Sequence, residues 1–204
     1  KTICMKYLIV ISLLFLNIIH SQNNENKLKS AVNLYISGEF NKSISELNEL
    51  EKIDTINLNK ILYFKGLNFL ELKKNTEALM IFDKNNLLYP NSIISHLGKG
   101  QYYLKSEEFD KAVYEFTKAI EIDYNYELAH YYRAESYFNK FDYKNAVTDY
   151  TNAISFNSED ADYYLNRAIC YYYLEEIEKS CKDYKYALKL DPSISEKLNL
   201  KICD

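Results

Sequence analysis

The sequence contains few of the residues on which turns between strands depend. Its 204 residues include four Gly, two Pro and no Trp. A β-sandwich or barrel joins many short strands through turns that rely on Gly and Pro, so this composition argues against both folds. Hydrophobic residues still make up 48% of the chain and charged residues 26%. These fractions are typical of a chain that folds, and they argue against a disordered protein.

The chain also has no block of positive charge. Its 25 basic residues are scattered among 29 acidic ones, which gives a formal net charge of −4. A mildly acidic chain without a basic patch argues against nucleic acid as the main partner. It argues equally against electrostatic attachment to anionic lipid.

Catalytic signatures are missing as well. The sequence contains no phosphate-binding loop, no dinucleotide fingerprint and no nucleophile elbow. His96 and His130 stand at equivalent positions, with no acid or cysteine at ligand spacing, so we expect them to pack rather than to bind a metal. The sequence therefore predicts a protein that is not an enzyme and that uses no cofactor or metal.

The first 21 residues differ from the rest of the chain. Met5 and Lys6 precede an apolar run over residues 7–15, and a small residue, Ser21, follows. This order is typical of a secretory signal with Met5 as the start. The run is shorter than the roughly 20 residues of a membrane span. We therefore expect an exported protein, located in the periplasm, in the cell envelope or outside the cell. The alternative is that this segment stays uncleaved as an anchor, and only then would the protein contact a membrane.

The remaining chain repeats itself with a period of about 34 residues, which is a length typical of helical repeats. Gly100, Ala134 and Ala168 share one column, and large aromatic residues share another: Phe116, Tyr150 and Tyr184. Such a period predicts an array of two-helix units, because no single unit can bury its own apolar face. Small residues fit where helix axes approach, and large ones fill the gaps between units. The repeats are expected over residues 22–192, and a capping helix over 193–204. The approximate bounds of the units are 24–57, 59–92, 93–126, 127–160 and 161–194.

The columns resemble those of the tetratricopeptide repeat. The third unit has Gly100-x2-Tyr103 and Ala112-x3-Phe116, while the second has Gly66-x2-Phe69 and Ala78-x3-Phe82. The chain departs from the family pattern in having no Trp and in lacking the closing Pro after its third and fourth units. The resemblance implies an all-α, right-handed superhelical solenoid of antiparallel helix pairs. It also implies a concave groove, lined by the first helix of each pair, that holds a peptide or protein segment.

Groove residues follow from their positions in the first helices, and they are mainly aromatic and aliphatic. Family members that bind acidic C-termini use a clamp of Lys, Asn and Arg, but the matching positions here are Leu97, Gln101, Tyr132, Asp162 and Asn166. These residues cannot hold two carboxylates, so an apolar peptide or an amphipathic helix is the expected ligand. The expected groove residues are Tyr63, Leu67, Leu70, Leu97, Gln101, Leu104, Lys105, Tyr131, Glu135, Phe138, Asn139, Leu165, Ile169, Tyr172 and Tyr173.

Two polar pairs recur with the same spacing in successive units. They are Arg133 with Asp149 and Arg167 with Asp183, and Lys99 with Glu115 imitates them. Because this spacing spans the turn of a unit, each pair is expected to join its two helices as a structural contact.

Two cysteines of the last unit are also expected to lie close together. Cys170 and Cys181 stand at mirror positions around its turn, and Cys203 follows in the tail. A disulfide between Cys170 and Cys181 is one interpretation, since an oxidising compartment allows it. Small buried apolar residues are the other interpretation.

Two functions remain as hypotheses. The first is an exported, non-enzymatic scaffold that binds a protein segment in its groove. The second is an envelope-anchored subunit that self-associates or joins a larger complex without a peptide ligand.

Overall fold

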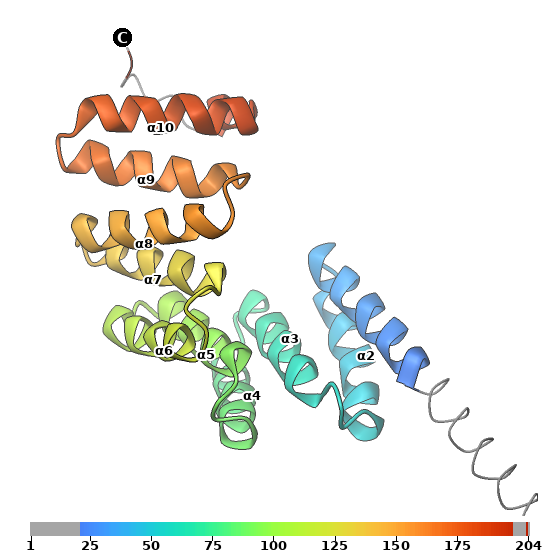
Figure 1. Ribbon diagram of the computed structural model, residues 1–204. Coiled ribbons are helices and arrows are strands. Elements are labelled where there is room, and N and C mark those ends of the chain that lie inside the picture. Colours follow the sequence, from blue (N-terminus) through green and yellow to red (C-terminus); the bar gives the residue numbers. More distant parts are fainter. Residues whose placement is uncertain (1–20, 198–202, 204) are drawn as a thin grey trace, which may run out of the picture. The chain divides into compact units, whose positions relative to one another are not determined.

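The computed structural model describes residues 21–197 and Cys203. All regular secondary structure in that part of the chain is helical, and no strand occurs within it (Figure 1). The predicted all-α fold of consecutive helix pairs is confirmed. The predicted signal segment lies outside the described residues except for Ser21, and so does half of the predicted capping segment 193–204.

The chain divides into two compact units, residues 1–90 and 91–204. In the first unit, residues 21–36 are helical and precede α2 (Phe40–Ile53), α3 (Leu58–Glu71) and α4 (Asn75–Leu88). Helix α3 packs against both α2 and α4. The core of this unit joins three helices through Leu28, Ala31, Leu47, Leu50 and Ile61.

The described part of the second unit contains three consecutive helix pairs and a short final helix. Each helix from α5 to α10 packs against the next one along the chain. The helices are α5 (Ile93–Lys105), α6 (Phe109–Ile122), α7 (Glu127–Asn139), α8 (Tyr143–Phe156), α9 (Ala161–Tyr173), α10 (Ile177–Leu190) and α11 (Ile194–Lys197). Ile194 of α11 is fully buried in a cluster with Ala168, Tyr184 and Ala187.

The small-residue column is explained by contact between the two helices of each pair. A Cβ atom added to Gly100 would lie 2.4 Å from the ring of Phe116, and one added to Gly66 would lie 2.4 Å from Phe82. The backbone of the first helix therefore rests directly on an aromatic ring of the second. A larger residue in this column would force the ring out of place, and such overpacking costs about 1–3 kcal/mol.

The turn within each pair uses one residue in the left-handed conformation. In the first pair, residues 21–36 with α2, this residue is Gly38, at φ 79°, as its cap position predicts. At the turn after α7, the amide of Asp142 donates to the carbonyl of Tyr137, which is the longer bond of a Schellman motif. The other left-handed residues recur at the equivalent place in each later pair: Lys73, Glu107, Phe141 and Glu175.

Candidate functional site

The recurring polar pairs join the helices of α7–α8 and α9–α10. Arg133 donates from Nε and Nη2 to the two carboxylate oxygens of Asp149, at 2.7 and 2.8 Å. Arg167 binds Asp183 in the same way, at 2.7 and 3.0 Å. Burial by itself would raise the pKa of Asp149, but the hydrogen bonds from Arg133 and His130 outweigh it and hold that pKa below its usual range.

Each arginine also reaches the preceding helix pair. The Nη1 atom of Arg133 donates to the hydroxyl of Thr117 on α6 at 3.0 Å, and that of Arg167 donates to Thr151 on α8 at 3.0 Å. Each guanidinium therefore bonds to two successive second helices from a first helix. This is a packing role between repeats, which sequence spacing within one repeat did not indicate.

The two histidines pack as expected, but each has an acidic neighbour that the sequence analysis missed. Nδ1 of His130 lies 3.2 Å from Asp149, and its Nε2 lies 2.8 Å from the carbonyl oxygen of Tyr124. Nδ1 of His96 lies 2.8 Å from Glu115. In both cases the two residues come together only once the two helices of the pair pack. No group of three or more metal-ligating side chains occurs among residues 21–197 and 203.

The expected pairing of Cys170 with Cys181 is wrong. Cys181 forms a disulfide with Cys203, and their Cα atoms are 5.3 Å apart. Cys170 is a free, buried thiol that packs with Ala146 and Tyr150 of α8. It belongs to the contact between neighbouring pairs, and burial raises its pKa to about 12. The mirror-position argument failed because it considered the turn of one pair and not Cys203, which bonds to Cys181 of α10.

The predicted groove residues differ in their exposure. Leu67, Leu70 and Leu97 are buried and cannot contact a ligand. Those that are partly buried are Tyr63, Gln101, Leu104, Tyr131, Glu135, Phe138, Leu165 and Ile169, and those that are exposed are Lys105, Asn139, Tyr172 and Tyr173.

In the second unit we define a first-helix face from the accessible residues of α5, α7 and α9. Every one of them keeps some exposed surface, so a ligand could contact them all. The residues of the first-helix face are Gln101, Leu104, Tyr131, Glu135, Phe138, Leu165, Ile169 and Tyr172.

Tyr131 is held within a group of rings. Its ring centre lies 5.1 Å from that of Tyr163, 5.2 Å from Tyr132 and 6.0 Å from Tyr150. Burial raises its pKa well above the ordinary value. This tyrosine therefore supports the contacts between α7, α8 and α9 as well as lining the surface.

Glu135 is the one acid of the first-helix face. It lies one helical turn after Tyr131 and Tyr132 on α7, and it is partly buried. Burial raises the pKa of its carboxyl. No ion pair or side-chain hydrogen bond to this carboxylate is present in the described part of the chain, whereas buried Asp149 and Asp183 each bind an arginine.

A second aromatic group lies where the α7–α8 turn meets the end of α9. The rings of Tyr143 and Tyr173 stack at 4.7 Å, with Phe138 and Phe141 at 5.6 and 6.4 Å from Tyr143. We call Phe138, Phe141, Tyr143 and Tyr173 the turn cluster. Phe141 is 77% exposed. Phe141 and Tyr143 were not predicted from the sequence because only first helices were considered. A signal was present, since Phe141 is aromatic where the equivalent turns have Lys73, Glu107 and Glu175.

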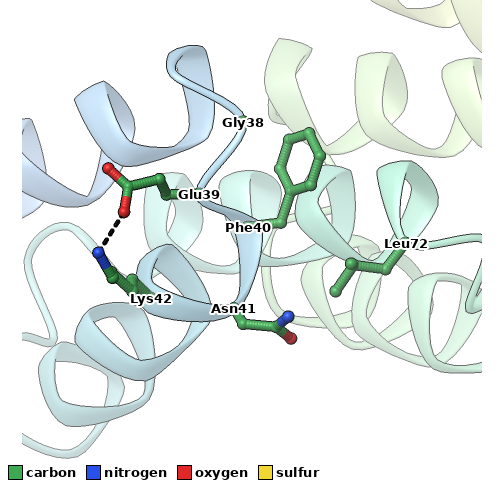
Figure 2. A pocket seen from close by; sticks show the side chains of 6 residues that line it. All are labelled: Gly38, Glu39, Phe40, Asn41, Lys42 and Leu72. Carbon is green, nitrogen blue, oxygen red and sulfur yellow. Dashed lines mark hydrogen bonds and ion pairs between the residues drawn. The ribbon is translucent and has the colours of Figure 1, made fainter.

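Two small cavities lie at turns and not on the first-helix face. One, of about 250 Å³, is lined by Gly38, Phe40, Asn41, Leu72 and the ion pair of Glu39 with Lys42 (Figure 2). The other, of about 300 Å³, is lined by residues 107–111 and Lys140. Both are small for a ligand site.

Helices long and apolar enough to cross a membrane do not occur among residues 21–197 and 203.

Family models of the tetratricopeptide repeat match residues 94–126 and 161–194. Two segments of the chain are thus similar to the tetratricopeptide repeat. The two matched segments correspond to the pairs α5–α6 and α9–α10, in which Gly100 and Ala168 occupy the small-residue column. No curated protein matches the sequence.

Solved structures with the same repeat fold cover most of the chain. A thermophilic tetratricopeptide-repeat protein of Thermus thermophilus, TTC0263, matches with a TM-score of 0.74 and 16% identity over 88% of this chain and 96% of its own. MamA from Desulfovibrio magneticus RS-1 matches with a TM-score of 0.65 and 16% identity, over 83% and 96%. The Cut9–Hcn1 hetero-tetramer of APC/C matches with a TM-score of 0.76 and 14% identity, over 85% of this chain and 35% of that chain. At these identities the likeness is one of fold.

Proposed function

We propose that this chain is an exported, non-enzymatic scaffold that binds a segment of a partner protein on the first-helix face of its second unit. The observation that carries the proposal is the composition of that face, where aliphatic and aromatic side chains of three successive first helices remain accessible. Tyrosine and phenylalanine contribute large contact area with few rotatable bonds, and such residues dominate binding energetics. Tetratricopeptide repeats typically bind proteins, and one matched structure is a hetero-tetramer.

The test must separate binding from packing. Changing Tyr131 would disturb both, because its ring contacts three others. Tyr172 is a better probe, since it lies on the face and is 45% exposed. A Tyr172→Ala, Leu104→Ala variant should lose partner capture from an envelope or secreted fraction and keep its helical content by circular dichroism.

The matched control is Tyr114→Ala on the second helix α6, where the tyrosine is 59% exposed. This variant should capture the partner as the unchanged chain does. Capture that survives the double variant and fails with Tyr114→Ala would place the binding surface on the second helices and contradict the proposal.

Export is supported by the disulfide between Cys181 and Cys203, because such bonds persist in oxidising compartments. With a secretory signal over residues 1–21, the mature chain should begin near residue 22. Intact-mass measurement of protein recovered from the extracytoplasmic fraction tests this. A chain that retains residues 1–21 would favour the anchored alternative.

Self-association is a second candidate function, and the turn cluster favours it. Phe141 exposes an apolar ring where the equivalent turns carry Lys73, Glu107 and Glu175. The mass in solution, measured by light scattering, should rise with the concentration of the unchanged chain. The Phe141→Glu variant should stay monomeric at the same concentrations. A chain that stays monomeric at all concentrations would exclude it.

A further inference from the structure

The charges of the first helices in the second unit are not distributed evenly around those helices. Helices α5, α7 and α9 contain four basic residues: Lys99, Lys105, Arg133 and Arg167. Lys99, Arg133 and Arg167 pair with acids on second helices, as Lys99 does with Glu115 at 3.8 Å. The basic side chains that are paired are therefore turned away from Glu135.

The charges that act on Tyr131, one helical turn before Glu135, are acidic. Three carboxylates act on the hydroxyl of Tyr131 and raise its pKa beyond the effect of burial: those of Glu135, Asp162 and Asp160. Glu135 acts in the same direction on the pKa of Tyr132. The charged side chains that act on Tyr131 therefore include carboxylates and no cation.

The rings beside Glu135 are fixed before any ligand arrives. Tyr132 stacks on Phe116 with ring centres 5.6 Å apart, and its hydroxyl hydrogen-bonds to the side chain of Gln101. Tyr131 packs edge-on against Tyr132. Residues three and four positions before Glu135 lie on the same side of α7 as Glu135 itself, so both rings border its carboxylate.

A carboxylate without a cation, bordered by two fixed tyrosine rings, is complementary to a basic side chain. The rings attract a cation through their faces and the carboxylate accepts its hydrogen bonds. A guanidinium suits this setting better than an ammonium, because it is planar, stacks on aromatic rings and is more weakly hydrated. We infer that Glu135, Tyr131 and Tyr132 form a binding site for a basic side chain of the partner segment, arginine in preference to lysine.

This inference rests on the proposed function, since it names a side chain that the bound segment carries. A random dodecapeptide library displayed on phage serves as the probe, with the full chain immobilised. Enriched peptides should carry an arginine or a lysine at a shared position. A synthetic copy of the most enriched peptide, and a second copy with Gln in place of that basic residue, are then titrated by calorimetry.

The two peptides are compared on three proteins. On the unchanged chain, replacing the basic residue by Gln should weaken binding at least about tenfold. On a Glu135→Gln variant the same replacement should matter less than about threefold, because the cation has lost its partner. A Glu178→Gln variant, altered at an exposed acid on second helix α10, should behave as the unchanged chain.

The outcomes separate this site from the function on which it rests. A library that enriches nothing would overturn both. Enriched peptides without a basic residue, or an equal loss on the unchanged chain and on Glu135→Gln, would overturn the cation site while leaving peptide binding in place. Spermidine that competes as strongly as the peptide would make the occupant a free polyamine, and would overturn the assignment to a protein side chain.

Discussion

A partly buried carboxylate destabilises a fold unless a cation accompanies it. Some buried acids of this chain have such a cation, and Glu135 does not. Asp149 and Asp183 each accept two hydrogen bonds from an arginine, so their burial is compensated. Glu135 has no such partner among the described residues, and burial raises its pKa. An acid at a position where it weakens the fold is a candidate for a role in binding.

The raised pKa of Glu135 predicts the sign of a stability change. Its carboxyl is disfavoured in the charged form, so folding carries a penalty at every pH above its folded pKa. The penalty disappears as the pH falls through that value towards the ordinary pKa of 4.5. Replacing Glu135 by Gln should therefore raise the melting temperature at pH 7, on the order of 2 °C.

The difference between Glu135→Gln and the unchanged chain should shrink as the pH approaches 4.5, as measured by thermal melts from neutral to mildly acidic pH. Glu178→Gln, at an exposed position, should show no such pH-dependent gain. A Glu135→Gln variant that melts below the unchanged chain at neutral pH would mean that the carboxylate has a stabilising partner.

At the scale of elements, the left-handed turns give each helix pair its shape. Gly38 adopts φ 79° without strain, whereas Lys73, Glu107, Phe141 and Glu175 hold the same conformation with a Cβ atom. That conformation costs a residue with a side chain about 1–2 kcal/mol. The bonds across each turn, such as that from Glu176 to the carbonyl of Tyr171 at 2.9 Å, maintain it.

Gly38 offers a clean measurement of this strain. A Cβ atom at Gly38 would meet nothing within 4 Å, so a Gly38→Ala change adds backbone strain and no clash. It should lower the free energy of unfolding by about 1 kcal/mol, as measured by urea denaturation. The reverse change, Glu107→Gly, should be neutral or slightly stabilising. An unchanged midpoint for Gly38→Ala would show that the turn can relax to negative φ.

The helix pairs could be predicted from the sequence because their packing is local and periodic. The contact of Gly100 with Phe116 recurs as a small residue and a ring at a constant offset, and the same offset indicated the arginine–aspartate pairs. Glu115 and Asp149, the acids beside His96 and His130, were not predicted. Each lies on the other helix of its pair, so the contact can be deduced only when the packing of the two helices is known. The burial of Leu97, on a face assigned to the ligand, also depends on that crossing.

At the scale of the whole molecule, the part of the chain that repetition predicts least well is its C-terminal end. The buried residues Ala168, Tyr184 and Ala187 of the pair α9–α10 form a cluster with Ile194, and Cys203 packs against it. The disulfide between Cys181 and Cys203 closes a loop over 22 residues of sequence separation. It therefore holds Cys203, which lies outside the repeat pattern, against α10.

Removing this disulfide should destabilise the last pair. A Cys203→Ser variant should lose about 3 kcal/mol of stability in the second unit, from the entropy of an open loop in the unfolded chain. Hydrogen exchange should become faster in α9 and α10 and stay unchanged in α2 and α3. Reductant should have the same effect on the unchanged chain and none on the variant. Equal exchange in all helices before and after reduction would contradict this role of the disulfide.

The bonds of Arg133 and Arg167 have a mechanical consequence. Arg133 ties α6 to α8, Arg167 ties α8 to α10, and the two ties share α8. Each arginine thus links two second helices through one ion pair and one hydrogen bond to a threonine hydroxyl. The ion pairs of the described residues include none that links α7 directly to α9. We expect the spacing between the second helices to stay nearly constant when the second unit bends. The first helices should then move relative to one another, so that the first-helix face opens or closes.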